Sequence, residues 1–580
     1  MKPDTSRFFV LAAALLLAAP LDAALKNPDT VIYAHTGEIT TLDPVYPYDS
    51  TTQGMMLNVY DTLIRFAGPS LTDFQPALAA KVPSEKNGLI SPDGLTYRFP
   101  LRKDVRFHKG ERLTPEDVRY SLLRFMLIDP EGGPASLLLE PVFGQATTRS
   151  PENKLTITRA EFDKAVKADR DGVTVRLKRP FGPFLSIMAR WSYVVDKKWC
   201  VANGEWDGAY ETIGRFNNRQ KESSGLYRAM NGTGPFELDS WDQNRKQLNL
   251  KAFPGYWSSP ARIKRVIMKT VSDFAARKTL LETGEADIID MARPNEPQLA
   301  GLQGVHIADN LPRLLTDPVF FFTFTVNANS QDIGSGKLDG QGIPPAFFSS
   351  ADVRRAFAYA FDYAGFLKDG MKGKAERARG AIPPGMAGYS PTAPVYEYNR
   401  LRAEEYFRKA YGGEVWNKGF RFTLTYNNGS DIRQLACESL KRTVEALNPR
   451  FRIDLRGVDW PVYIDKAQNR KAPLFTRGWT GDYPDPHNFA FPFYHSKGRF
   501  ALAQGFADKE LDKLIETAVA EPSAAKRALL YARVQAKAHE NALQLYTAHP
   551  LGLYGLRDWL KGFYDNAVFM GIYFYPLSKQ

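Results

Sequence analysis

The sequence is poor in several features that would define its class. Only 2 of its 580 residues are cysteine, too few for a disulfide scaffold. Beyond the N-terminus, no stretch reaches the roughly 18 uninterrupted apolar residues of a membrane-spanning helix. No run of about five or six basic residues occurs despite the net charge of +12, so nucleic acid is not an expected partner.

Motifs for catalysis are also missing. The chain contains no Gly-x-Ser-x-Gly elbow, no His-Glu-x-x-His motif and no P-loop. An enzyme would need an activated nucleophile, a base with its orienting group, or a metal cluster. We therefore predict that the protein is not an enzyme and needs no cofactor.

The N-terminus has the layout of a secretory signal peptide. Lys2 and Arg7 precede an apolar run over residues 8–19, and small residues for cleavage follow at 21–24. No cysteine follows the run, which excludes a lipoprotein anchor there. We expect residues 1–23 to be removed and the rest to be a soluble, monomeric periplasmic protein.

Length and composition predict a packed protein of two or three lobes. Apolar residues make up 44% and aromatic residues 13% of the chain, which is typical of globular proteins. A chain of 580 residues exceeds what one hydrophobic core usually supports. Basic residues are interspersed with acidic ones, as at 400–405, so the net charge indicates a solvated surface of mixed charge.

Periodicity and capping signals predict mixed strands and helices. Apolar residues alternate over 95–101 and 173–177, which is typical of strands. Thr114 and Pro115 mark a helix start, with Thr114 as N-cap. We further expect strands at 236–238, 246–252, 263–271, 320–326, 420–426, 474–479 and 571–575, and helices at 352–367, 400–411, 431–447, 508–520 and 523–541.

The segment 478–489 holds the most informative carboxylate. Asp482 stands between Trp479 and Tyr483, and no Lys or Arg occurs between Trp479 and Phe489. Two large rings would strip water from the acid, and a desolvated carboxylate needs a cationic partner, which can be a ligand ammonium. The alternative is an Asx-type turn in which Asp482 caps its own backbone.

The same segment also contains residue types that can bind a metal ion. Asp482, Asp485, His487 and His495 carry the carboxylates and imidazoles that suit zinc or nickel. Their spacing follows no known ligand pattern, and the prolines at 484 and 486 explain the segment as a rigid turn. No metal is expected.

Several motifs, taken in order, carry a resemblance to a known family. Residues 95–110 followed by 113–118 resemble the hallmark of family 5 solute-binding proteins, the large extracytoplasmic receptors of peptide-type ABC importers. Further segments match in the same order along nearly the whole chain: 42–44, 231–236, 256–257, 282–287, 352–357 and 479–482.

The resemblance implies an α/β fold of the periplasmic-binding-protein type, a class II Venus flytrap with two hinge strands and an extra small lobe. Lobe I would comprise residues 24–66, 185–315 and 553–580. The extra lobe II would comprise 67–184, and the ligand-binding lobe III would comprise 316–552.

The resemblance also implies a function and a site. In the oligopeptide and dipeptide receptors of this family, the acid of the matching Trp-x-x-Asp loop receives the α-ammonium of the peptide. By similarity Asp482 would do so here, with Trp479 and Tyr483 walling the pocket and Trp460 lining a side-chain pocket. The partner would be the transmembrane permease of an ABC importer, to which the protein delivers its peptide.

Other ligands stay open. Gly481, Pro484 and Asp485 depart from the oligopeptide pattern, and relatives of this family also carry nickel chelates, haem, opines and oligosaccharides. A non-peptide solute on the same scaffold is therefore the alternative, and a periplasmic hydrolase is the least favoured function.

The two cysteines fall in different lobes under this scheme. Cys200 would lie in lobe I and Cys437 in lobe III, so a bond between them would lock the two lobes together. We predict that they are not joined and that both are small buried hydrophobic side chains.

Overall fold

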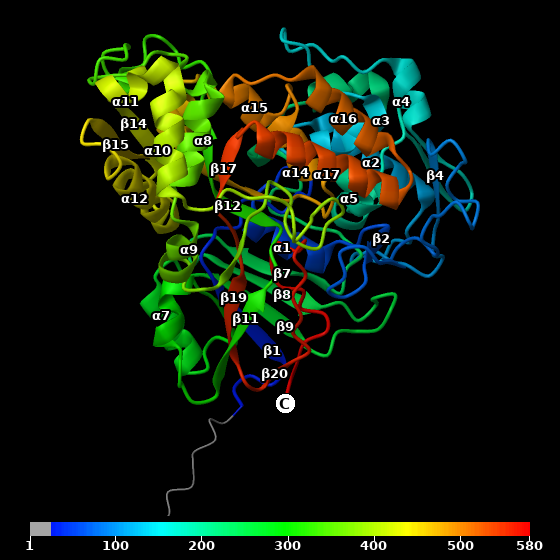
Figure 1. Ribbon diagram of the computed structural model, residues 1–580. Helices are drawn as coiled ribbons and strands as arrows, with labels where there is room; N and C mark the ends of the chain where they lie inside the picture. Colours follow the sequence, from blue (N-terminus) through cyan, green and yellow to red (C-terminus); the bar gives the residue numbers. More distant parts are fainter. Residues whose placement is uncertain (1–24) are drawn as a thin grey trace, which may run out of the picture.

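The protein is a mixed assembly of sheets and helices, as predicted (Figure 1). The structure is a computed structural model that describes residues 25–580, so the predicted signal peptide lies outside the described residues. A seven-stranded sheet occupies the lower half of the view in Figure 1. Its strands, in spatial order, are β11 (Val305–Leu311), β19 (Gly552–Arg557), β10 (Ile288–Asp290), β1 (Thr30–His35), β9 (Arg265–Thr270), β8 (Gln247–Ala252) and β7 (Phe236–Asp242).

A second large sheet has five strands. Three of them run parallel and are joined by helical crossovers, because parallel neighbours cannot be linked by a hairpin. Phe451, Ile453 and Leu455 alternate with polar residues in a strand that was not predicted from the sequence. The strand predicted at 320–326 begins and ends earlier, at Leu315 and Phe322. The spatial order is β15 (Phe451–Val458), β14 (Phe420–Asn427), β16 (Leu474–Thr480), β12 (Leu315–Phe322) and β17 (Gln544–Tyr546).

The chain passes between the two large sheets twice. Residues 312–314 lead from β11 to β12, and residues 547–551 lead back from β17 to β19. The two passages lie side by side, since Leu311 pairs with Gly552. A Cβ on Gly552 would meet the Arg313 guanidinium at 2.4 Å, so glycine is needed for this close approach. Two short adjacent connections are the arrangement that permits hinge motion.

A third, small sheet lies beside a capped helix. The helix α2 (Pro115–Ile128) begins where predicted, with a capping box between Thr114 and Asp117. The small sheet has the order β4 (Thr96–Pro100), β6 (Gly172–Arg176) and β5 (Val166–Ala168).

A buried ion triad joins α2 to the N-terminal part of the chain. Arg124 of α2 is 1% exposed and donates to both oxygens of Asp43, at 2.7 and 2.6 Å. Its Nη2 also donates to Glu205 at 2.6 Å. A bidentate arginine–carboxylate pair matches in geometry, and its desolvated charges compensate one another. The triad gives a structural reason for Asp43 in the segment 42–44.

Four predicted helices are confirmed in the second half of the chain, but the one predicted over 352–367 is wrong as a single helix. It ends at Ala360, because Phe361 is extended with ψ 128° and Asp362 caps a new turn by accepting from the Gly365 amide at 2.9 Å. The confirmed helices are α10 (Arg400–Lys409), α12 (Asp431–Glu445), α16 (Lys509–Ala520) and α17 (Ala524–Glu540), and the shortened one is α8 (Ala351–Ala360).

The strand predicted at 571–575 is wrong. This segment joins no sheet, although its residues alternate as in a strand. Asn58 of α1 (Ser50–Val59) satisfies its backbone instead, accepting from the Phe574 amide at 2.8 Å and donating to the Ile572 carbonyl at 2.9 Å. A side-chain amide thus replaces the ladder that the pattern would otherwise need.

Both cysteines are buried and lie in separate hydrophobic clusters. Cys200, on α6 (Lys197–Ala202), belongs to the largest cluster, and Cys437, on α12, belongs to the cluster behind the five-stranded sheet. Burial raises the pKa of the Cys437 thiol to about 12 and that of Cys200 further still. Within residues 25–580, no helix is long and apolar enough to cross a membrane.

We predict that Arg124→Met lowers the free energy of unfolding by about 3–5 kcal/mol, because it leaves two buried carboxylates without a cation. The control is Arg98→Met, which removes an ion pair whose members are 37% and 46% exposed and should cost less than about 1 kcal/mol. Urea denaturation measures both. Equal losses in the two variants would contradict a stabilising role of the triad.

Candidate functional site

The site begins at the end of strand β16. This strand pairs with β12 as far as Leu315 and Thr480, and the chain then turns at Gly481. A Cβ on Gly481 would approach the Phe489 ring to 2.9 Å and the Leu314 Cβ to 3.1 Å. The Gly481 amide also donates to the Leu314 carbonyl at 2.6 Å. Glycine therefore lets the loop pack directly on the passage between the two sheets.

Asn488 braces the loop that carries the acid. Its Oδ1 accepts from the Asp482 amide at 2.8 Å, and its Nδ2 donates to the Asp482 carboxylate at 3.1 Å. Its main-chain oxygen accepts from the Trp479 indole at 2.8 Å. One asparagine thus fixes the position of both the acid and the neighbouring ring.

The Asp482 carboxylate is buried without a cation. The residue is 5% exposed, and among residues 25–580 no Lys or Arg side chain lies within ion-pair distance of it. No backbone amide of the described chain donates to this carboxylate either, so the Asx-turn alternative is wrong for Asp482. That role belongs to Asp485, whose Oδ1 accepts from the His487 amide at 2.8 Å.

Side chains from the first part of the chain close over the acid. Trp191, at the end of α5 (Phe184–Trp191), donates its indole hydrogen to the Asp482 main-chain oxygen at 2.9 Å. Tyr48 packs edge-on against Trp191, with ring centroids 5.9 Å apart, and its hydroxyl lies close enough to the Asp482 carboxylate to affect the pKa of that acid. Residues far apart in sequence therefore complete the environment of this one acid.

Burial raises the pKa of the Asp482 carboxyl from 3.8 to about 6. The hydrogen bond from Asn488, the nearby Tyr48 hydroxyl and the more distant charges of Arg190 and Arg499 oppose this rise without cancelling it. Arg190 is itself buried and donates to Gln53 and Tyr193. The site therefore holds an acid that is mainly ionised at neutral pH and that a nearby cation would stabilise.

A cavity of about 230 Å³ lies between the two large sheets, beside the Asp482 loop. Tyr33 and Asp290 line it from the seven-stranded sheet, and Thr480 lines it from β16. Its volume is below the roughly 300–1,000 Å³ of sites for drug-sized molecules, which favours a small ligand.

The aromatic residues predicted for the site lie at different depths. Trp479 is half-buried and packs edge-on against Phe500 at 5.8 Å, whereas Tyr483 is buried at 4% exposure. Trp460 begins α13 (Trp460–Gln468) and is 47% exposed. Of the predicted site residues, Trp479 and Asp482 are linked to each other by hydrogen bonds to the same residue, Asn488.

The residues of the possible metal site each interact with a different side chain. Asp485 pairs with Arg527, His487 lies 3.6 Å from Glu140, and His495 lies 3.4 Å from Glu516. Within the described part of the chain, no group of three His, Cys, Asp or Glu side chains is arranged to hold a metal ion.

Several residues around Asp482 were not predicted from the sequence, because they are remote from it along the chain. Asn488 lies inside the segment 478–489 and could have been suspected as a turn amide. Tyr48, Arg190 and Trp191 carry no local signal, since only the folded chain brings them to Asp482.

The family model described as "Bacterial extracellular solute-binding proteins, family 5 Middle" matches residues 73–501. The chain therefore belongs to this family of bacterial extracellular solute-binding proteins, which confirms the resemblance.

The similar proteins cover nearly the whole chain. The dipeptide-binding protein of Escherichia coli K12 is 24% identical, over 97% of each chain. A periplasmic binding protein of Helicobacter pylori, solved with the peptide STSA, has a TM-score of 0.70 at 20% identity, covering 95% of this chain and 98% of that one. NikZ of Campylobacter jejuni, solved with Ni(L-His), has a TM-score of 0.68 at 19% identity, covering 95% and 100%. The Venus-flytrap fold is confirmed.

We predict that Asp482→Asn stabilises the ligand-free protein, which is unusual for a buried polar substitution. The rise of about two pKa units costs the ionised form about 3 kcal/mol. Because the folded-state pKa lies above the unfolded one, this cost is absent below about pH 4 and complete above about pH 6. Urea denaturation should show a gain of about 1–3 kcal/mol at pH 8 that disappears at pH 4.

The matched control is Asp485→Asn, three residues away and equally buried at 5% exposure. It breaks the pair with Arg527 and should cost about 3 kcal/mol, because a guanidinium that is only 12% exposed loses its partner. Destabilisation of similar size in both variants would show that Asp482 is an ordinary structural acid.

Proposed function

We propose that the protein is an extracytoplasmic substrate-binding protein that captures peptides with a free amino terminus between its large lobes. It delivers them to the permease of an ABC importer. The observation that supports this proposal is the buried, cation-free carboxylate of Asp482, which the α-ammonium of a peptide would neutralise. An ion pair shielded from water is far stronger than an exposed one.

Strand β16 offers a place for the peptide backbone. Its partner β14 pairs with it only at Leu474 and Phe475, so within residues 25–580 the stretch from Thr476 to Thr480 has no strand neighbour on that side. An extended peptide can add to such an edge through main-chain hydrogen bonds, which read backbone and largely ignore side chains. The adjacent cavity of about 230 Å³ suits a short peptide.

The remaining ligand-binding roles belong to aromatic residues. Trp479 and Tyr483 wall the pocket on either side of the acid, and Trp460 lines a side-chain pocket at its outer end. The half-exposed position of Trp460 is compatible with contact to a variable ligand side chain. These assignments extend the roles of matching family positions to this chain.

We assign residues 24–66, 185–315 and 553–580 to lobe I, 67–184 to lobe II and 316–552 to lobe III. The strand membership of the two large sheets supports this division. The protein is monomeric in the periplasm after loss of residues 1–23, and its lobes open to load and close to hold the ligand. It performs no chemistry and releases each peptide unchanged.

We predict that trialanine binds to the wild-type protein at pH 7.5 at least a hundredfold more tightly than N-acetyl-trialanine. Acetylation removes the ammonium and leaves the Asp482 charge unpaired, which costs about 3–5 kcal/mol. Isothermal titration calorimetry measures both affinities, and mass spectrometry of the recovered ligand tests whether it is intact.

Asp482→Asn should bind the free and acetylated peptides with similar weak affinity, while the folded fraction of Asp485→Asn should keep the wild-type preference. Equal affinity of the wild-type protein for the two peptides would exclude the ammonium role. Cleaved ligand would exclude a purely binding function. A co-purified ligand of one fixed, non-peptide mass in native mass spectrometry would favour the alternative solute.

A further inference from the structure

A small cavity lies in the second half of the chain, and none of residues 478–489 lines it. Its volume is about 20 Å³, and all of its lining residues fall within 363–546. A cavity needs roughly 10–15 Å³ to hold one water molecule, so this one has room for a single particle of about that size. It is therefore separate from the cavity beside the Asp482 loop.

The lining of this cavity carries cationic groups and no acid. It includes the guanidinium groups of Arg377 and Arg379 and the imidazole of His539, whereas none of its 13 residues is Asp or Glu. Four other cavities of residues 25–580 each have an aspartate or a glutamate in their lining. The small cavity thus differs from them in its charge balance.

Arg377 has one N–H group without an acceptor. Its guanidinium carbon lies 3.6 Å from the centroid of the Tyr363 ring, which covers one face. Its Nη1 donates to the Tyr546 carbonyl at 2.7 Å, and its Nη2 donates to the Tyr396 carbonyl at 2.9 Å. Its Nε is fully enclosed and has no hydrogen-bond partner within residues 25–580. The carbonyl groups satisfy hydrogen bonds, but they carry no net charge to compensate the guanidinium.

The other two groups are also incompletely partnered. Arg379 donates to the Ala393 carbonyl at 2.6 Å, and in the described part of the chain neither it nor Arg377 forms an ion pair. The His539 ring packs on Tyr396, with centroids 4.4 Å apart, and its nitrogens make no hydrogen bond to any residue in 25–580. Donor groups from three side chains are therefore left for the cavity.

The electrostatic effects agree with this geometry. Burial lowers the pKa of Arg377, and the charge of Arg379 adds to that effect, although Tyr363 and Glu397 oppose it. Burial also lowers the pKa of His539 below 6.5, so its imidazole is mainly neutral at pH 7.5 and donates one N–H. Glu397 does not line the cavity. Two like charges, one of them desolvated, thus lie near each other without an ion-paired acid.

We propose that this cavity binds a single halide ion, with chloride as the physiological ligand, between Arg377, Arg379 and His539. A negative ion compensates the two guanidinium charges, which a water molecule cannot do. It also accepts charge-assisted hydrogen bonds from the Arg377 Nε and the neighbouring donors. The size of the cavity selects a monatomic ion, because carboxylate and phosphate groups need more space.

The position of the site gives the ion a structural role. Strand β13 (Ala375–Arg377) pairs with β18 (Ala548–Pro550), which belongs to the return passage between the two large sheets. Arg377 also donates to the Thr547 carbonyl at 3.3 Å, where this passage begins. A bound halide would therefore stabilise the contact between residues 375–379 and the passage. This role is independent of the proposed peptide binding.

We predict that chloride stabilises the ligand-free protein in a saturable way. Replacing gluconate by about 200 mM chloride at constant ionic strength should raise the Tm by about 2–5 °C, because the ion binds only the folded state. Gluconate is too large for the cavity. Arg379→Met should reduce this chloride response to below about 1 °C. Differential scanning calorimetry at pH 7.5 measures both proteins.

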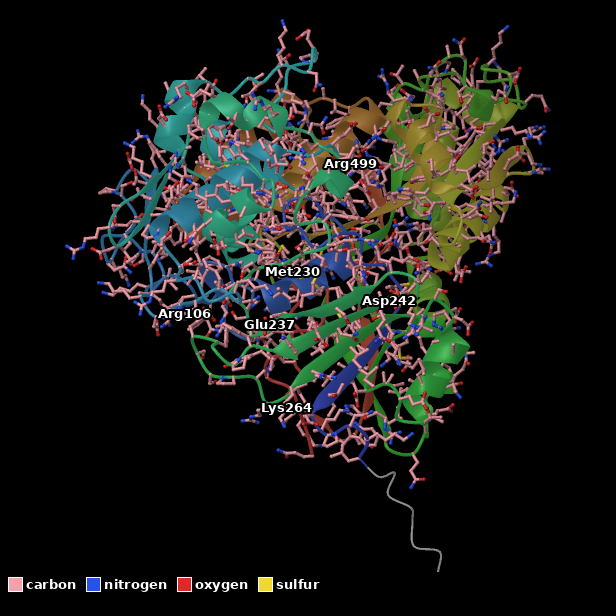
Figure 2. The ribbon with its side chains drawn as sticks, turned by 180° about the vertical axis from the view of Figure 1, so that it is seen from behind. Arg106, Met230, Glu237, Asp242, Lys264 and Arg499 are labelled. Atoms are coloured by element: carbon pink, nitrogen blue, oxygen red, sulfur yellow. The ribbon has the colours of Figure 1, made fainter. Side chains whose placement is uncertain are left out.

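The matched control is Arg106→Met. Arg106, like Arg379, donates to one main-chain carbonyl, that of Gly110 at 2.8 Å, and forms no ion pair within residues 25–580. Figure 2 shows it on the opposite side of the view from the yellow-green part of the chain, which includes residues 377–379. Its loss should leave the chloride response at the wild-type value. An equal response in wild type and Arg379→Met would overturn the inference, because the ion would then act elsewhere.

Crystals of the wild-type protein grown in bromide locate the ion directly. Data collected at the bromine absorption edge should show an anomalous peak in the cavity beside the Arg377 Nε. A cavity without such a peak would refute the site, and a peak without any chloride response in the wild type would mark an adventitious ion only. If Arg379→Met does not fold, His539→Phe replaces it and should at least halve the response. An undiminished response in that variant would likewise contradict the site.

Discussion

The carboxylate of Asp482 loses its water on folding and, among residues 25–580, receives in return only a hydrogen bond from Asn488. This bond does not offset burial, since the pKa of the acid rises to about 6. A protein can sustain such a cost only where surrounding structure holds the group in place. Gly481 packs the loop on the passage between the sheets, and Trp191 holds its main chain from the other side.

Stability and binding are carried by different charged groups of the same chain. Arg124 joins Asp43 and Glu205 in a compensated buried cluster. At the cleft, Asp482 is desolvated and lacks a partner of opposite charge among residues 25–580. A group left unpaired in this way costs stability in the free protein and gains free energy only when a ligand cation arrives. The ammonium group of a peptide is such a cation.

The features that could be predicted from the sequence are those that depend on residues close together in the chain. Thr114 and Pro115 specify a helix start on their own, and Asp482 between Trp479 and Tyr483 identified the acid. Prediction failed where distant partners decide the outcome: Asn58 replaces a strand ladder at 571–575. Tyr48 and Trp191 come close to Asp482 only in the folded chain.

The proton balance of binding tests the role of Asp482 most directly. Calorimetry of trialanine binding at pH 6, in buffers of different ionisation enthalpy, counts the protons released. With a free-state pKa of about 6 that falls when an ammonium pairs with the acid, about half a proton should leave per peptide bound. The release should grow toward pH 5 and vanish in Asp482→Asn. Peptide binding without proton release at pH 6, or with the same release in the variant, would contradict an ammonium at Asp482.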